Sequence, residues 1–361
     1  MQSEAASHAS HASPANRRAA RGIFLHTGWR SGGTWLWSRL RAVSSVSAYY
    51  EPFSTLLGEL TQDAVATFKP SVVSGHPALD APYYDEYRPL IDAGGCGVSG
   101  YHKSFGTDRF GASPDAGFPA LRAYLQGLAD HAQHTGRAPA YKFCRSQGRM
   151  PWLRSAFPDD LHVWVWRNPA SQFASGWMLK QQWQNAFFVA APFRVLGLNR
   201  DEPVVQKVIE MCGVTLPPGA PTSVESYAAL CDQYARTVEG LQAYRAFLAL
   251  WVLCASRLTD DIELTVDMDR VGRIPEYAGE LREQFRVHAE VSPDFSGARN
   301  LVGEAAHLAD RVKGIDGGAL RPVHSSAQKF IQSQATDSQK QLVETVREKL
   351  ILASEISASW R

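Results

Sequence analysis

Short apolar runs alternate along the chain with longer stretches in which apolar residues recur every three or four positions. The short runs are rich in β-branched and aromatic residues, and this pattern predicts strands. The first run begins at Ile23 and leads into a glycine-rich turn, and the clearest run, Leu161–Trp166, is apolar at most positions. The other expected strands cover residues 46–50, 140–144 and 262–266.

The longer stretches predict helices at residues 35–43, 121–134, 152–157, 224–258, 275–287 and 328–357, and a further helix that starts at Pro169. Strands that alternate with helices are typical of a parallel sheet covered by helices on both faces. We therefore expect an α/β fold, with residues 21–361 in a single domain. Residues 69–113 and 291–326 have no sustained period, so we expect an irregular insertion and a loop there.

Composition and charge restrict the classes of partner. The 361 residues are 45% hydrophobic and 20% charged, which is typical of an ordinary soluble globular protein. A net charge of +1 gives no reason to expect nucleic acid or an anionic membrane as partner, so any basic site must be local. The longest apolar run, near residues 247–255, is too short to cross a bilayer. We expect a cytoplasmic protein without a transmembrane segment.

The first twenty residues are rich in Ala, Ser and His, contain Arg17 and Arg18, and lack an apolar core. They predict a disordered tail, with a transit peptide as the alternative. The five cysteines are widely spaced and form no C-x-x-C pair, which predicts reduced, mostly buried thiols in a reducing compartment. No cluster of His, Cys, Asp or Glu has the spacing of a metal site, so we expect no metal.

The turn after the first strand has the layout of an anion-binding loop. Glycines allow a tight turn whose N–H groups approach a phosphate, and the N-terminus of the following helix adds a partial positive charge. Arg30 supplies a full charge and Thr34 a hydroxyl. An ordinary βα connection with the same composition remains the alternative. The candidate binding residues of this loop are Arg30, Ser31, Gly32, Gly33, Thr34 and Trp35.

Four ionisable residues fall near or just past the carboxyl ends of expected strands. They are Arg30, Glu51, Lys142 and Arg167. In parallel sheets ligands bind outside the carboxyl ends of the strands, so these side chains should meet at one edge.

Two motifs resemble those of the sulfotransferases. The loop from Arg30 to Trp35 is similar to the family's phosphosulfate-binding loop, with glycine where a first threonine is more common. It lacks the lysine of a nucleotide-triphosphate loop, because Gly33 precedes Thr34. The second motif, Arg167-Asn168-Pro169 with Ser175 eight residues after the arginine, is similar to the family's 3′-phosphate site.

The resemblance implies a P-loop-like sulfotransferase fold and 3′-phosphoadenosine 5′-phosphosulfate (PAPS) as sulfuryl donor. It also implies that Trp35 stacks on adenine, with a core residue on the helix face as the alternative. In the cytosolic branch of the family a histidine on the strand before the Arg-Asn-Pro motif is the catalytic base. The corresponding expected strand here, residues 140–144, contains no histidine. Glu51 stands instead where the tyrosylprotein, heparan-type and bacterial branches place a glutamate base, with Lys142 as its partner. His102 and His26 are alternative bases.

The implied activity is transfer of a sulfuryl group to a hydroxyl or amine, catalysed by Glu51, Lys142 and Arg30. A nucleotide kinase and a non-catalytic nucleotide-binding protein are the alternatives. The acceptor stays open between a small molecule, a carbohydrate, a lipid and a protein tyrosine, and the oligomeric state is not predicted. Residues 311–314 are a faint match to the family's C-terminal Arg-Lys-Gly element. Aromatic residues near Tyr83, Tyr84, Tyr87 and 183–188 either line an acceptor pocket or pack in the core.

Overall fold

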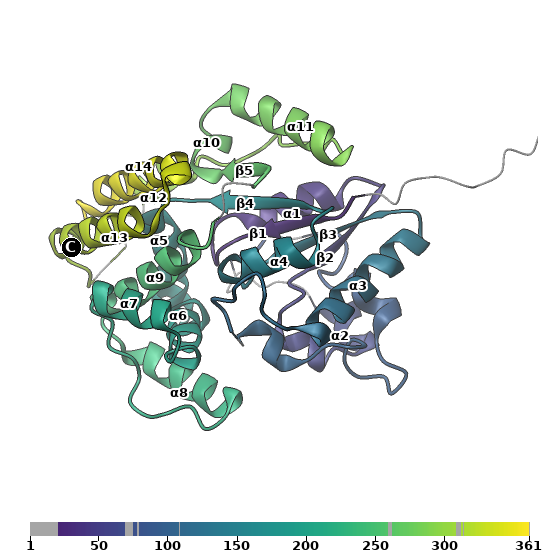
Figure 1. Ribbon diagram of the computed structural model, residues 1–361, viewed down its shortest axis with the longest axis horizontal. Coiled ribbons are helices and arrows are strands. Elements are labelled where there is room, and N and C mark those ends of the chain that lie inside the picture. Colours follow the sequence, from purple (N-terminus) through teal and green to yellow (C-terminus); the bar gives the residue numbers. More distant parts are fainter. Residues whose placement is uncertain are drawn as a thin grey trace, which may run out of the picture.

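In a computed structural model of the protein, five parallel strands form a central sheet (Figure 1). Their order across the sheet is β2-β3-β1-β4-β5. The structure describes residues 21–68, 75–77, 79–107, 109–258, 262–307, 312 and 314–360. The expected tail and residues 311 and 313 of the 311–314 motif lie outside these residues. The strands are β1 (Ile23–His26), β2 (Val46–Tyr50), β3 (Ala138–Phe143), β4 (Leu161–Trp166) and β5 (Leu264–Asp267).

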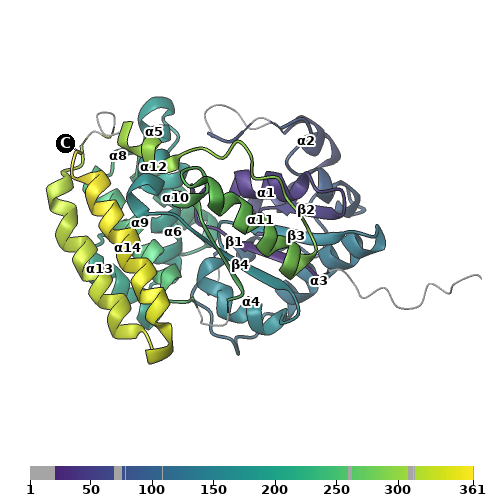
Figure 2. The same cartoon turned by 90° about the horizontal axis from the view of Figure 1, so that it is seen from above.

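Helices cover both faces of the sheet. Two of them, α1 (Gly33–Arg41) and α11 (Pro275–Ala289), lie over one face, as the view from above shows (Figure 2). The opposite face is covered by α3 (Pro119–His134) and α4 (Met150–Ala156). The connections that follow the neighbouring strands β1 and β3 therefore leave toward opposite faces. A crevice forms between two such strands at their carboxyl ends, and this is where α/β sheets bind ligands.

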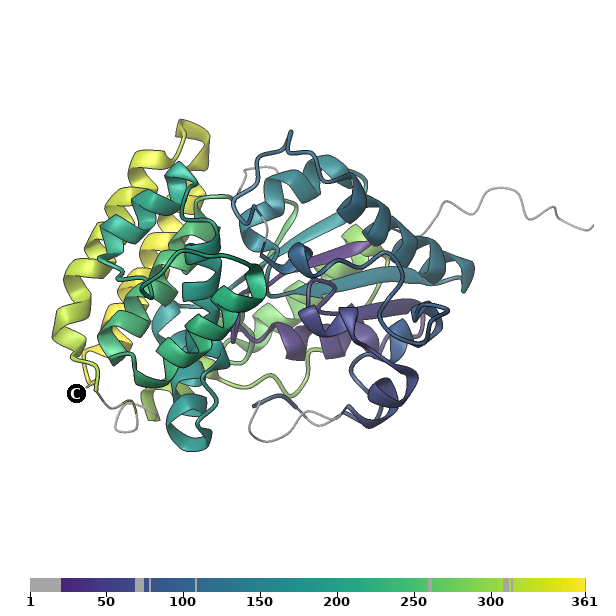
Figure 3. The same cartoon turned by 90° about the horizontal axis from the view of Figure 1, so that it is seen from below.

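A group of helices lies beside the sheet, next to β4 and β5 (Figure 3). Alternate residues of β4 face different parts of the core: Val163 and Val165 pack with the other strands, whereas Trp164 and Trp166 pack against the helical group. The members of the group are α5 (Pro169–Trp183), α6 (Phe187–Leu198), α7 (Pro203–Cys212), α8 (Val224–Thr237), α9 (Gly240–Ala255), α13 (Arg321–Gln334) and α14 (Lys340–Ser357).

Short elements connect these layers. The connection between β2 and α3 is irregular, as expected, and consists mainly of short turns in its described part. The short helices are α2 (Gln62–Thr67), α10 (Met268–Val271) and α12 (Leu301–His307). The 3₁₀ turns are η1 (Thr55–Gly58), η3 (Asp85–Leu90), η4 (Lys103–Gly106), η5 (Gln147–Arg149), η7 (Gly317–Leu320) and η8 (Asp337–Gln339).

The expected fold class is confirmed: the sheet is all-parallel, flanked by helices and consistent with a P-loop-like fold. The single long helix expected at 328–357 is wrong, because the chain leaves the helix at Ala335 with an extended backbone and restarts at Thr336, which forms a capping box with Gln339. Residues 291–326 are not only loop, since they contain α12, η7 and the start of α13.

None of the helices in the described part of the chain is long and apolar enough to span a membrane. All five cysteines are free; Cys96 is exposed and the other four are buried, in agreement with the expectation of mostly buried thiols. Tyr83, Tyr84 and Tyr87 are almost completely buried, so these three residues pack in the core.

Candidate functional site

The turn between β1 and α1 is shaped by two glycines. Gly32 is the N-cap of α1 and has a φ of 93°, a left-handed conformation that favours glycine. At Gly33 an added Cβ would lie 2.5 Å from Cγ2 of Thr27, so no side chain fits. Helix α1 therefore begins directly after this tight turn, and the N–H groups of its first turn lack partners within the helix, as in loops that bind anions.

Two hydroxyl groups of this turn have weak or no partners. The Ser31 hydroxyl is buried and has no hydrogen-bond partner within the described residues. Thr34 Oγ1 lies 3.4 Å from the Tyr50 hydroxyl, at the long end of hydrogen-bond distances. A buried hydroxyl without a hydrogen-bond partner destabilises a native protein. An anion bound in this turn would accept hydrogen bonds from these hydroxyl groups.

Arg30 and Arg167 meet above the turn. Arg30 has a φ of 64°, and its Nε and NH2 lie 3.2 Å and 3.1 Å from the Ser175 hydroxyl of α5. Arg167, at the end of β4, donates from NH1 to the carbonyl oxygen of Arg30 over 2.6 Å. It also donates from Nε to the Ser171 hydroxyl over 2.9 Å. The structure thus brings together the predicted residues Arg30, Arg167 and Ser175.

Positive charge is concentrated at this point. Burial and the charges of Arg30 and Arg299 together lower the pKa of Arg167 to about 10, although Asp269 raises it. Burial and Arg299 also lower the pKa of Arg30. Arg299 itself donates to Glu304 over 2.6 Å. Three guanidinium groups that repel one another favour an anion with more than one negative charge. Sequence reasoning missed Arg299, which lies in an irregular segment without a motif.

Glu51 and Lys142 form a buried ion pair at the tips of the neighbouring strands β2 and β3. Glu51 has a φ of 48°, a conformation that costs a non-glycine residue about 1–3 kcal/mol and occurs often at functional sites. Its Oε1 contacts Lys142 Nζ, and its Oε2 accepts from the Cys144 N–H over 3.0 Å. Arg145 lies 3.7 Å from the same carboxylate.

The surroundings keep both members of this pair charged. Burial raises the pKa of Glu51, but Lys142, Arg145 and the hydrogen bonds outweigh this and lower it below its ordinary value. Burial lowers the pKa of Lys142, yet the Cys144 sulfur, Glu51 and Tyr50 raise it well above its ordinary value. At neutral pH Glu51 is therefore ionised, the form in which a carboxylate can accept a proton. The Lys142 ammonium also lies 3.1 Å from Cys144 Sγ, which is 3.8 Å from the carbonyl oxygen of Gly28 in the turn between β1 and α1.

A buried polar network holds the Arg167 end of the site. Asn168 donates to both carboxylate oxygens of Asp269, from its main-chain N–H and its Nδ2, each over 2.8 Å. Lys349 of α14 in turn donates to Asp269 over 2.7 Å and to Asp267 over 2.5 Å. Sequence reasoning missed Asp269 and Lys349, because their ion pairs join residues about 80 positions apart.

The remaining candidates have different surroundings. Trp35 is half-buried, and its ring centroid lies 5.9 Å from that of Phe295 and 5.7 Å from the Arg39 guanidinium. Its stacking on adenine stays a prediction. His26 is fully buried between Ser146 and His162, with nitrogens 2.9 Å from each, and therefore does not reach an acceptor. His102 is exposed, at the start of η4.

The chain has no match among the family models, the curated proteins or the solved structures to which it was compared. No group of three or more His, Cys, Asp or Glu side chains that could hold a metal ion occurs among residues whose positions are described. The case for a function therefore depends on the geometry of the site and on the resemblance of its two motifs.

Proposed function

We propose that the protein is a sulfotransferase that transfers the sulfuryl group of PAPS to a hydroxyl or amine of an acceptor. The observation that carries the proposal is the convergence of Arg30, Arg167 and Ser175 beside the glycine turn, with the Glu51–Lys142 pair on the neighbouring strand tips. PAPS has separate anionic groups on its 3′ and 5′ sides. The Arg30 and Arg167 guanidinium groups offer a site for one of these anionic groups, and the Lys142 ammonium beside the glycine turn offers a site for the other.

In the proposed complex Arg167 and Ser175 hold the 3′-phosphate. Arg30, expected from the sequence as a catalytic residue, is assigned to the same phosphate because its guanidinium contacts Ser175. The N–H groups of the glycine turn, the Ser31 and Thr34 hydroxyls and the Lys142 ammonium hold the 5′ side. The unsatisfied hydroxyl of Ser31 and the crowded guanidinium groups fit such an occupant, because an anion would satisfy the first and neutralise the second. Trp35 lies on the first turn of α1, where its ring is half-exposed and able to contact the base.

The donor supplies a sulfuryl group whose bond to the 5′-phosphate oxygen breaks as a new S–O or S–N bond to the acceptor forms. Glu51 takes the proton that the acceptor hydroxyl or amine loses, a contribution of about 10²–10⁴-fold. Lys142 and the main-chain N–H groups of the turn stabilise the charge that collects on the 5′-phosphate oxygen. The protein residues therefore position the groups and stabilise charge in an in-line displacement.

Lys142 links the binding of the donor to the basicity of Glu51. Its ammonium contacts Glu51 and lies beside Cys144, which borders the glycine turn. When the ammonium shifts toward an anion in the turn, Glu51 loses part of its neutralising charge and its pKa rises. Donor binding would then make Glu51 a stronger base in the complex than in the free protein.

The proposal is tested by calorimetric titration with 3′-phosphoadenosine 5′-phosphate (PAP), the desulfated product, and with ATP. We expect saturable binding of PAP and at least tenfold weaker binding of ATP without added Mg²⁺. A stronger response to ATP with Mg²⁺ would favour a kinase instead. Transfer of radiolabelled sulfate from PAPS to a panel of acceptors separates an enzyme from a non-catalytic nucleotide-binding protein. Absence of PAP binding would refute the proposal.

A further inference from the structure

A three-residue segment between α2 and η3 lies against the proposed donor site. NH2 of Arg30 donates to the main-chain oxygen of Gly75 over 3.4 Å, and a Cβ added at Gly75 would lie 2.8 Å from the same nitrogen. At the other end of the segment, the Tyr83 hydroxyl donates to the main-chain oxygen of Pro77 over 2.6 Å. His76 is therefore placed between two contacts that hold the backbone on either side of it.

The imidazole of His76 packs against two aromatic rings. Its centroid lies 6.3 Å from that of Tyr50, in an edge-to-face arrangement, and 6.1 Å from that of Tyr83. The Tyr50 ring also has the Lys142 ammonium 4.8 Å from its centroid, and its hydroxyl lies 3.4 Å from Thr34 Oγ1 in the first turn of α1. Through Tyr50 the imidazole is thus next to both the glycine turn and Lys142.

The titratable and charged groups that face this imidazole come from the surrounding elements. They are Arg30 of the turn, Lys142 of β3, Glu51 at the end of β2, and the tyrosines Tyr50 and Tyr83. Burial and the charges of Lys142 and Arg30 together lower the pKa of His76 to about 3, although Glu51 raises it. The imidazole is therefore uncharged at neutral pH in the protein without nucleotide.

A bound donor would reverse the electrostatic field at His76. In the proposed complex the anionic groups of PAPS contact Arg30 and Lys142. They would offset the two charges that oppose protonation of the imidazole and add negative charge of their own. A neighbouring anion favours the imidazolium form, which donates hydrogen bonds from both ring nitrogens. This extra positive charge would then be present only while the donor is bound.

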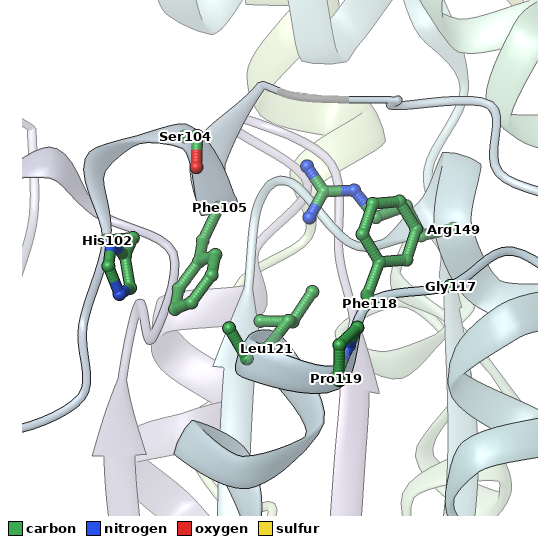
Figure 4. A pocket seen from close by; sticks show the side chains of 9 residues that line it. His102, Ser104, Phe105, Gly117, Phe118, Pro119, Leu121 and Arg149 are labelled. Atoms are coloured by element: carbon green, nitrogen blue, oxygen red, sulfur yellow. The ribbon is translucent and has the colours of Figure 1, made fainter.

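His102, the other histidine between β2 and α3, has different surroundings. It lines a pocket of about 250 Å³ between η4 and the start of α3 (Figure 4). Its ring centroid lies 5.4 Å from that of Phe105, which lines the same pocket. The nine residues that line this pocket include neither Arg30 nor Lys142. Of these two histidines, the geometry therefore associates His76 with the donor site.

We propose that His76 is a further donor-binding residue, which takes up a proton when the nucleotide binds and, as imidazolium, donates a hydrogen bond to the 5′ side of PAPS. The proton comes from the solvent and binds to a ring nitrogen of His76, so each nucleotide brings at most one proton to this residue. This inference rests on the proposed function, because the anion that changes the charge of His76 is the sulfuryl donor described above.

The test is calorimetric titration with PAP at pH 6.5 in two buffers that differ in ionisation enthalpy, which counts the protons taken up on binding. We expect the wild type to take up at least about 0.5 proton more per nucleotide than His76→Gln or His76→Phe. The first variant keeps a hydrogen-bonding side chain and the second keeps an aromatic ring against Tyr50, but neither side chain can be protonated. The exposed His134→Gln on α3 is the matched control and should behave like the wild type.

The same proton uptake predicts how affinity depends on pH. A ligand whose binding takes up a proton binds more weakly as the pH rises toward the pKa of the bound imidazole. The ratio of PAP affinity in the wild type to that in His76→Gln should therefore fall about five- to tenfold between pH 6 and pH 8. A ratio that does not change with pH would overturn the proposal. So would a loss of affinity in both variants without any difference in proton uptake, because a ring that only packs would produce it.

The two proposals fail separately. If PAP binds to the wild type and to both variants with the same proton uptake, this inference is refuted while the proposed function stands. If the wild type binds no PAP, the proposed function is refuted, and the role of His76 as a donor-binding residue is refuted with it. Binding of PAP with additional proton uptake only in proteins that keep His76 supports both proposals.

Discussion

Arg167 donates a hydrogen bond from NH1 to the main-chain oxygen of Arg30, 2.6 Å away. The side chain at the end of β4 therefore fixes the backbone at the end of β1, where Arg30 adopts a left-handed conformation. Arg30 in turn directs its guanidinium to Ser175. One contact thus supports the conformation of the turn and brings two positive charges to the same place.

This arrangement predicts how Arg167 acts on nucleotide affinity. Arg167→Ala should weaken PAP binding about 10- to 100-fold, because a hydrogen bond to a charged group contributes about 1.5–3 kcal/mol. The affinity for adenosine 5′-monophosphate, which lacks the 3′-phosphate, should fall less than threefold in the same variant. Calorimetry with both nucleotides measures the difference, and the exposed Arg236→Ala on α8 serves as control. Equal losses for the two nucleotides would remove Arg167 from the 3′-phosphate site.

The Glu51–Lys142 pair predicts a separation of activity from stability. Glu51→Gln should keep PAP binding and reduce turnover about 10²–10⁴-fold, since it removes the proton acceptor. It should also destabilise the fold by about 3–5 kcal/mol, because the ammonium of Lys142 is left buried without a carboxylate. The double variant Glu51→Gln/Lys142→Met should recover most of this stability and none of the activity.

Urea unfolding and initial rates of sulfate transfer check this prediction. Glu59→Gln is the control, because Glu59 pairs with the exposed Lys103 at the surface and its loss should leave both properties unchanged. Normal turnover in Glu51→Gln would show that another group accepts the proton, and His102 would then be the next candidate.

Lys349 predicts a distant effect on the site. Lys349→Met should leave Asp267 and Asp269 without their cation and destabilise the protein by about 3–5 kcal/mol. PAP affinity should fall as well, because Asp269 holds Asn168 next to Arg167. Lys340→Met, at the exposed start of the same helix, is the control. Unchanged PAP affinity in folded Lys349→Met would show that the network supports the fold alone.

His162 predicts the dependence of stability on pH. Burial lowers its pKa from 6.5 to about 4, so below pH 6.5 the unfolded chain binds a proton that the folded protein does not. Its contribution to stability is complete above pH 6.5 and is lost as the pH falls toward 4, by about 3 kcal/mol. Urea unfolding at several pH values measures how the free energy of unfolding changes with pH. This change should be smaller for His162→Gln than for the wild type or the exposed His134→Gln. An identical pH dependence in all three proteins would contradict the lowered pKa of His162.

The strands and the meeting of residues at one sheet edge could be predicted from the sequence, because apolar periodicity is a local signal and the alternation of strands with helices implies a parallel sheet. Ser175 shows the limit of this reasoning. The spacing of the motif relates it to Arg167, yet its hydroxyl bonds Arg30, which belongs to another strand and another motif. Which side chain contacts which depends on the packing of α5 against the turn.

Residues without a motif were harder to predict. Asp269 and Lys349 form their ion pair across about 80 residues, and Arg299, whose charge acts on Arg30 and Arg167, lies in an irregular segment. Helices α6 and α7 were not predicted. Helix α6 is apolar on most of its surface and contains Pro192, so burial on several sides removes the polar face that marks an amphipathic helix. Helix α7 has an amphipathic pattern, but it extends over only 10 residues and was missed.

The clamp that Lys349 forms on Asp267 and Asp269 has a consequence for biosynthesis. Both aspartates lie beside the Arg167 segment, whereas Lys349 follows Asp269 by 80 residues along the chain. During translation the strands of the sheet leave the ribosome before this lysine does. The nascent protein therefore completes the Lys349 network only after the whole sheet has been synthesised, and a variant without α14 would lack that support.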